Sequence, residues 1–98
     1  MKEITTTEVQ RRLEAGEQLH LIDVRELAEV EEGHIPGVVH IPLGTLPDHL
    51  EELDQSKSYI IVCRSSARSG KATAFLHEKG FDATNMVGGM LAWEGEVE

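Results

Sequence analysis

Apolar residues along the chain form two kinds of pattern, continuous runs and helical repeats, which alternate from one end to the other. The continuous runs predict strands around Ile4 and at 19–24, 38–41, 59–62 and 81–87. The run from Tyr59 to Val62 has no polar interruption. Such a run is typical of a central parallel strand that is covered on both faces.

Between these runs, apolar residues recur three or four positions apart, which predicts helices. The repeats are Val9 and Leu13, then Leu27 and Val30, then Leu46, Leu50 and Leu53, then Ala72, Phe75 and Leu76, and finally a short stretch with Leu91 and Trp93. Strands that alternate with helices indicate βαβ units and a parallel sheet. We therefore predict one three-layer α/β/α domain over residues 1–98, with a five-stranded parallel sheet between two layers of helices.

The charge of the chain limits its partners. Aspartate and glutamate number 18 against nine lysines and arginines, which gives a net charge of −9. A nucleic-acid binder needs a basic face to neutralise phosphates, and an anionic membrane surface makes the same demand. We therefore expect neither nucleic acid nor a membrane as a partner. The acidic run Glu26, Glu29, Glu31 and Glu32 is interpreted as a solvated helix face.

The chain has a single cysteine, Cys63, and this count restricts both chemistry and compartment. It allows no intramolecular disulfide, and neither a four-cysteine nor a cysteine–histidine zinc site can be assembled. The N-terminal residues resemble neither a signal peptide nor a transit helix, and no apolar run approaches the length of a membrane span. These features predict a cytoplasmic protein, and we expect a monomer.

Cys63 follows the strongest predicted strand directly and opens a polar loop that extends to Arg68. Chemistry in open α/β sheets is found at the carboxyl ends of strands. The positive end of the following helix, inward loop amides and the cations Arg64 and Arg68 all favour a thiolate. A lone cysteine at a strand end is often only a small core residue. Its position in an arginine-bearing loop at a helix start favours a functional role here.

At four segments the chain resembles the rhodanese family of sulfurtransferases. The matching segments are LIDVRE at 21–26, GHIPGVVHIP at 33–42, CRSSARS at 63–69 and VGGMLAW at 87–93. Each is weak evidence alone, whereas all four in order within one small domain are strong evidence. The resemblance implies the strand order 3-2-4-5-1. In that order the residues Asp23 and Arg25 end a strand beside the one that ends at Cys63.

The resemblance also implies the chemistry of sulfane-sulfur transfer. Cys63 attacks a donor such as thiosulfate and becomes a persulfide, and cyanide or an external thiol, including one on a protein, takes the outer sulfur. The substrate-binding loop then consists of Arg64, Ser65, Ser66, Ala67, Arg68 and Ser69. Arg68 holds the sulfonate-like end of the donor and Arg64 assists. No metal ion or organic cofactor is implied.

Three site residues carry a second interpretation. Asp23 and Arg25 are expected to form an ion pair that fixes the turn after a strand, with support of the site as the alternative.

Ser66 stands where the family usually has glycine. If that position requires a positive φ, serine costs on the order of 1 kcal/mol or more. Otherwise the loop differs in shape and the Ser66 hydroxyl adds a donor to the site.

Two other functions stay open at this point. Phosphatases and arsenate reductases of the same fold also use a cysteine loop, but theirs is one residue longer than the four residues between Cys63 and Arg68. The shorter loop suits a single sulfur atom better than a tetrahedral phosphate. Binding or regulatory rhodanese-like modules often lack the cysteine that this chain keeps. Transfer to a small molecule and delivery to a protein partner are not separated by the sequence.

Overall fold

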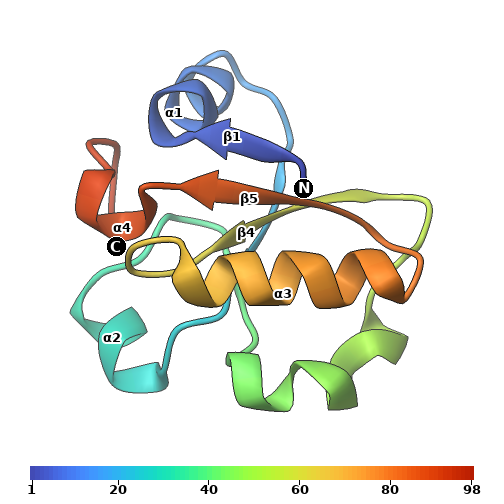
Figure 1. Cartoon of the computed structure of the whole chain (residues 1–98). Coiled ribbons are helices and arrows are strands. Elements are labelled where there is room, and N and C mark those ends of the chain that lie inside the picture. The colour runs from blue at the N-terminus through green and yellow to red at the C-terminus, as the bar shows by residue number, and fades with distance from the viewer.

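A parallel sheet of five strands forms the middle layer of the computed structural model, which describes all 98 residues (Figure 1). The strands are β1 (Glu3–Thr5), β2 (His20–Asp23), β3 (Val39–His40), β4 (Ser58–Val62) and β5 (Asp82–Val87). They are ordered β1-β5-β4-β2-β3, and every neighbouring pair is parallel. This is the order 3-2-4-5-1 counted from the other edge, so the predicted topology is confirmed.

Helices cover both faces of the sheet, which confirms the predicted three layers. They are α1 (Thr6–Glu14), α2 (Leu27–Glu32), the 3₁₀ helix η1 (Leu43–Glu52), α3 (Ala67–Glu78) and α4 (Gly89–Ala92). In Figure 1, α1 lies above the sheet, α3 and the green η1 lie below it, and α4 lies at its left end, beyond β5. No helix combines the length and the apolar character that a membrane span requires.

The core consists of two clusters, one on each face of the sheet. Ile61 of β4 belongs to the cluster under α3 and η1, and Ile60 and Val62 belong to the cluster under α1. All three side chains are buried. Successive residues of a strand point to opposite faces, so a strand buried on both faces needs an uninterrupted apolar run. The predicted central position of β4 is therefore confirmed.

One helix differs in type from the prediction. The spacing of Leu46, Leu50 and Leu53 predicts an α-helical face, but the chain forms a 3₁₀ helix with Pro47 inside it. Proline has no backbone N–H, and in an α-helix its ring collides with the carbonyl four residues earlier, which disfavours α-helical geometry here. The apolar face was predicted correctly, because Leu46 is buried and the other two leucines pack against the core.

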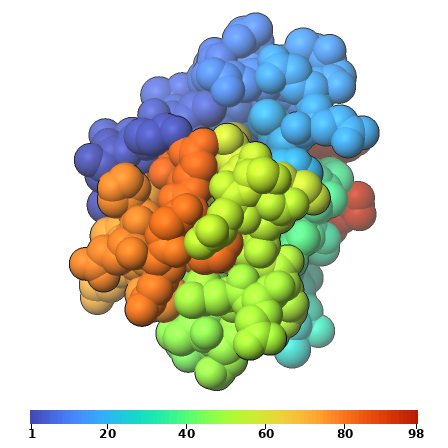
Figure 2. Space-filling model, turned by 90° about the vertical axis from the view of Figure 1, so that its right-hand side faces the viewer, coloured from blue at the N-terminus to red at the C-terminus, as the bar shows by residue number.

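The register between β2 and β4 determines where the polar ends of these strands meet. Asp23 pairs with Val62, and Cys63 is the next residue. Both strands therefore end at the same edge of the sheet, on the left of Figure 1. Figure 2 shows the opposite edge, where the strands begin, with the blue N-terminal segment above and the green η1 below. The candidate active-site residues at the ends of β2 and β4 thus lie at one end of the molecule.

Candidate active site

Cys63 lies between the end of β4 and the start of α3. Residues 64–66 connect the two elements, and α3 begins at Ala67. The sequence predicts a polar loop as far as Arg68, whereas Ala67, Arg68 and Ser69 form the first turn of the helix. The loop is therefore shorter than predicted, and it folds tightly over the cysteine, which is only 1% exposed.

The sulfur of Cys63 takes part in two hydrogen bonds. The amide of Ser66 donates to Sγ over 3.1 Å, and the thiol donates to Oγ of Ser69 over 3.2 Å. Burial raises the pKa of the Cys63 thiol, but the hydrogen bonds that the Ser69 hydroxyl and the amides of Ser69, Ser65 and Ser66 donate to the thiolate form lower it by more. The pKa of Cys63 therefore lies below its usual range, which favours the nucleophilic thiolate.

This direction of the pKa shift agrees with the sequence prediction, and the groups that cause it agree in part. The sequence analysis assigned the effect to the helix dipole, to inward loop amides and to the charges of Arg64 and Arg68. In the structure the groups that lower the pKa most are backbone amides and one hydroxyl. Amides held in a tight loop are fixed dipoles that stabilise an anion without a full opposing charge.

Ser66 is the one non-glycine residue with a positive φ, at φ 137° and ψ −8°. This conformation confirms the first of the two interpretations of Ser66. It lets the Ser66 amide point at Sγ, while the Ser66 carbonyl accepts from the amide of Gly70 over 2.8 Å in the first turn of α3. The Ser66 hydroxyl makes no hydrogen bond within the chain, so serine brings backbone strain here without a compensating bond.

The guanidinium of Arg68 is bound to a carboxylate of the chain itself. Nη1 lies 2.6 Å from Oε1 of Glu29, and Nη2 lies 2.8 Å from Oε2. The hydrogen bond from Arg68 is the main reason why the pKa of Glu29 falls to about 2. The interpretation of the acidic run as a solvated face is therefore wrong for Glu29. Arg68, predicted to hold the donor, already has an anionic partner.

Arg64 is the exposed cation of the loop, and it has no ion pair within the chain. It lines a hollow of about 290 Å³ together with Arg25, Glu29 and Leu91. Leu91 is 64% exposed, and Val97 of the same hollow is 54% exposed. The hollow beside the loop therefore combines the unpaired cation of Arg64, the carboxylates of Glu29 and Glu32, and exposed apolar side chains.

Asp23 and Arg25 form the ion pair that the sequence predicts. Nη2 of Arg25 lies 2.8 Å from Oδ2 of Asp23, and both side chains are buried. The same guanidinium donates to the carbonyl of Gly33 over 2.8 Å and to that of Glu29 over 3.3 Å. These bonds attach both α2 and the residue after it to the end of β2, which is a structural task. Support of the site by this pair stays a prediction.

Gly89 brings α4 against the cysteine loop. The amide of Met90 donates to the carbonyl of Cys63, and the amide of Leu91 donates to that of Arg64, both over 2.9 Å. A Cβ atom at Gly89 would lie 2.4 Å from the Arg64 oxygen, so no larger residue fits without displacement. The backbone of the loop is therefore fixed by the start of α4 as well as by α3.

Comparison with known proteins places this arrangement in a family. The profile of the rhodanese-like domain matches residues 5–96. This chain belongs to the rhodanese-like family. YtwF of Bacillus subtilis, which is named provisionally as a sulfurtransferase, is 49% identical to it over 98 residues, 100% of this chain and 95% of that protein. A protein of Allochromatium vinosum named as a sulfurtransferase is 34% identical over 94 residues, 95% of this chain and 88% of that protein.

A solved structure supports the assignment at the level of the fold. The crystal structure of a rhodanese-like domain protein from Staphylococcus aureus superimposes with a TM-score of 0.95 at 39% sequence identity. The match covers 100% of this chain and 97% of that one. The resemblance stated from the four sequence segments is therefore confirmed, and the curated relatives place the chain among the rhodanese-like sulfurtransferases.

Two residues that hydrogen-bond to the first turn of α3 in this rhodanese-like domain were not predicted as part of the site. Glu29 was treated as solvated, and nothing near it in the sequence indicates its distant partner Arg68. Asn85 was not singled out, although it is polar and lies inside a predicted strand. In the structure it is only 4% exposed and accepts a hydrogen bond from Ser69. A side-chain amide inside a predicted strand of the sheet needs hydrogen-bond partners when it is buried. That need was the signal in the sequence that could have identified Asn85.

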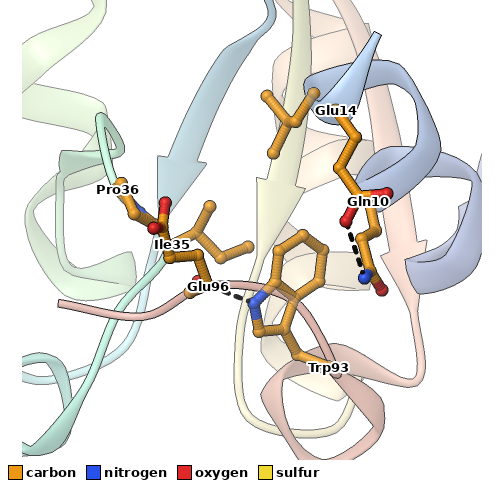
Figure 3. A pocket seen from close by; sticks show the side chains of 7 residues that line it. Gln10, Glu14, Ile35, Pro36, Trp93 and Glu96 are labelled. Carbon is orange, nitrogen blue, oxygen red and sulfur yellow. Dashed lines mark hydrogen bonds between the residues drawn. The ribbon is translucent and has the colours of Figure 1, made fainter.

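A second hollow of the rhodanese-like domain, of about 420 Å³, has none of residues 63–69 in its lining (Figure 3). Its walls include Ile35 and the indole of Trp93, whose Nε1 donates to the Glu96 carbonyl over 3.0 Å. Trp93 and Ile35 pack in the cluster under α1, whereas Cys63 belongs to the cluster on the other face. This hollow is therefore not part of the candidate active site.

Proposed function

We propose that this protein is a sulfurtransferase that carries a sulfane sulfur as a persulfide on Cys63. The donor class is an anion such as thiosulfate, and the acceptor is cyanide or an external thiol. The observation that carries the proposal is the environment of the Cys63 sulfur, which faces amide and hydroxyl donors and has a lowered pKa. Membership of the rhodanese-like family supports the same reaction class.

In the first step the Cys63 thiolate attacks the outer sulfur of thiosulfate. A sulfur–sulfur bond to Cys63 forms, the sulfur–sulfur bond of the donor breaks, and sulfite leaves with the electron pair. The product is an anionic persulfide. Amides that already point toward Cys63 Sγ favour such an anion, since they need no reorganisation when it forms. The small space around an almost fully buried cysteine favours a small donor.

In the second step the acceptor attacks the outer sulfur of the persulfide, and the Cys63 thiolate is released with the electron pair. Cyanide is thereby converted to thiocyanate, and an acceptor thiolate is converted to a persulfide. The chain has one cysteine, so no second thiol of the same chain accepts the sulfur. Splitting the transfer into two displacements is covalent catalysis, in which each step is easier than the direct reaction.

Anion recognition is assigned first to Arg64, because it lines the hollow beside the loop without an ion-pair partner. Arg68 contributes only when the donor replaces Glu29 as its partner. This pairing also disfavours phosphatase activity, since Arg68, the arginine that would bind a phosphate, is already paired with Glu29. The loop of four residues between Cys63 and Arg68 argues in the same direction.

Intact-mass measurement after incubation with thiosulfate tests the proposal. The wild type is expected to gain the mass of one sulfur atom, lose it on addition of cyanide and yield thiocyanate, while Cys63→Ser shows none of these changes. Thermal unfolding of Cys63→Ser serves as the control for folding. Absence of sulfur uptake from thiosulfate and from other sulfane donors contradicts the proposal. Hydrolysis of an aryl phosphate that depends on Cys63 contradicts it as well.

A further inference from the structure

A buried chain of hydrogen bonds runs from the cysteine to β5. The Cys63 thiol donates to Ser69 Oγ over 3.2 Å, and the Ser69 hydroxyl donates to Oδ1 of Asn85 over 2.6 Å. Nδ2 of Asn85 in turn donates to the carbonyl of Ser66 over 3.4 Å. Ser69 is fully buried and Asn85 is 4% exposed, so water does not compete for these bonds.

The direction of each bond in this chain follows from the groups involved. The Ser66 carbonyl only accepts, so the NH₂ side of the Asn85 amide faces it and the oxygen faces Ser69. That amide oxygen also only accepts, so the single hydrogen of the Ser69 hydroxyl points to Asn85. The Ser69 oxygen is then left to accept the proton of the Cys63 thiol.

A hydroxyl has one hydrogen, and in this site two acceptors compete for it. When Cys63 is a thiol, the hydrogen of Ser69 can stay on Asn85. When Cys63 is an anion, the sulfur needs that hydrogen, and its transfer leaves the buried oxygen of Asn85 without a donor. An unpaired buried acceptor is unfavourable. By holding the hydrogen of the Ser69 hydroxyl, the amide oxygen of Asn85 therefore disfavours the thiolate form of Cys63.

We propose that Asn85 is a positioning residue that holds the hydrogen of Ser69 away from Cys63 and so favours the thiol over the thiolate in the empty site. The Ser69 hydroxyl turns toward the sulfur once the sulfur is anionic. Asn85 thereby opposes the loop amides, and the balance between the two determines how reactive the resting cysteine is. The inference concerns protonation of Cys63, so it does not require that the protein transfers sulfur.

None of the charged side chains near the cysteine is a member of the hydrogen-bond chain. Arg68 lies on α3 and pairs with Glu29 of α2, Arg64 lies on the loop, and the Asp23–Arg25 pair closes β2. Arg64 and Arg25 line the hollow beside the loop, as does Glu29. Substitution of Asn85 or Ser69 by alanine changes none of these charges. A shift in the titration of Cys63 then reports on the hydrogen-bond chain.

The test is the rate of alkylation of Cys63 by iodoacetamide as a function of pH, in four proteins. Asn85→Ala is expected to lower the pKa of Cys63 by about one unit, which makes alkylation about tenfold faster below that pKa. Ser69→Ala removes a donor and is expected to raise the pKa by a similar amount. In the double variant, Asn85→Ala is expected to add no shift, because it acts through Ser69.

A matched control separates this effect from general loosening of the loop. Thr73→Val removes another buried hydrogen bond, from Thr73 Oγ1 to the Ser69 carbonyl over 2.7 Å, and leaves the Ser69 hydroxyl in place. It is expected to leave the alkylation profile unchanged. Asn85→Val is the second variant should Asn85→Ala fail to fold, because it removes the acceptor without adding a charge, and it is expected to lower the pKa of Cys63 in the same way.

Three results overturn the inference. The first is a pKa of Cys63 that is unchanged or higher in Asn85→Ala. The second is a shift by Asn85→Ala that persists when Ser69 is already alanine. The third is a profile of Thr73→Val that moves as far as that of Asn85→Ala. Alkylation needs no sulfur donor, so none of these results depends on the outcome of the sulfur-transfer experiment.

Discussion

Arg68 of α3 and Glu29 of α2 form a two-point ion pair, with oxygen–nitrogen distances of 2.6 and 2.8 Å. The two residues are 39 positions apart in the chain. Their side chains are 33% and 28% exposed, so solvent and small anions reach the pair. An anionic donor near Cys63 must therefore compete with Glu29 for the arginine.

We predict that Glu29→Gln lowers the KM for thiosulfate about three- to tenfold, because it releases Arg68 for the donor. The fold of α2 is expected to survive, since Glu29 closes a capping box by accepting from the amide of Glu26, and glutamine serves equally well there. Steady-state kinetics with cyanide as the acceptor measure the change, which should shrink as ionic strength rises.

The control for this kinetic prediction is Glu31→Gln, which removes the same charge from an exposed position of α2. It is expected to leave the KM almost unchanged. If both variants lower the KM equally, the effect is one of net charge, and competition for Arg68 is the wrong explanation.

The same ion pair predicts a loss of stability in acid. The pKa of Glu29 is about 2 in the folded protein, below its ordinary value of 4.5. A depressed carboxyl pKa adds stability that is complete above the unfolded pKa and is lost as pH falls toward the folded one. Urea unfolding between about pH 5 and about pH 2 should thus show a smaller decline for Glu29→Gln than for the wild type. Equal declines in the two proteins contradict this assignment.

Ser66→Gly is expected to stabilise the protein by about 1 kcal/mol, since φ 137° at Ser66 is strained for any residue with a Cβ atom. The hydroxyl that is lost makes no hydrogen bond within the chain. The matched control is Ser65→Gly, where φ is not positive and glycine only increases the entropy of the unfolded chain, so stability should fall. Chemical denaturation compares the two. A loss of stability in both variants indicates that Ser66 is not strained.

Gly89→Ala is expected to destabilise the protein by about 3 kcal/mol or more and to slow alkylation of Cys63, because its Cβ atom would meet the Arg64 and Cys63 carbonyls at 2.4 and 2.6 Å. Gly37→Ala is the control, since Gly37 also has a positive φ but nothing within 4 Å of an added Cβ atom. The free energy of unfolding of Gly37→Ala should fall by about 1 kcal/mol, because only the unfavourable positive φ contributes. Equal unfolding free energies would show that the close approach at Gly89 has no energetic consequence.

Much of the fold could be predicted from local pattern. The run from Tyr59 to Val62 indicated a doubly covered strand, and β4 is buried on both faces. The leucines of η1 indicated the correct apolar face, but Pro47 changed the helix type. The position of Cys63 at a strand end followed from the same reasoning, because the end of an apolar run is visible in the sequence.

The sequence by itself determined the strands, most of the helices, the parallel sheet and the cysteine loop, because each depends on neighbouring residues or on a contiguous motif. Only the tertiary structure decided that Arg68 is held by Glu29 and that Ser69 is held by Asn85, 16 positions away. It also decided that amides and a hydroxyl dominate the lowering of the pKa of Cys63. Those contacts join residues on different elements, and their geometry exists only once the sheet has brought these elements together.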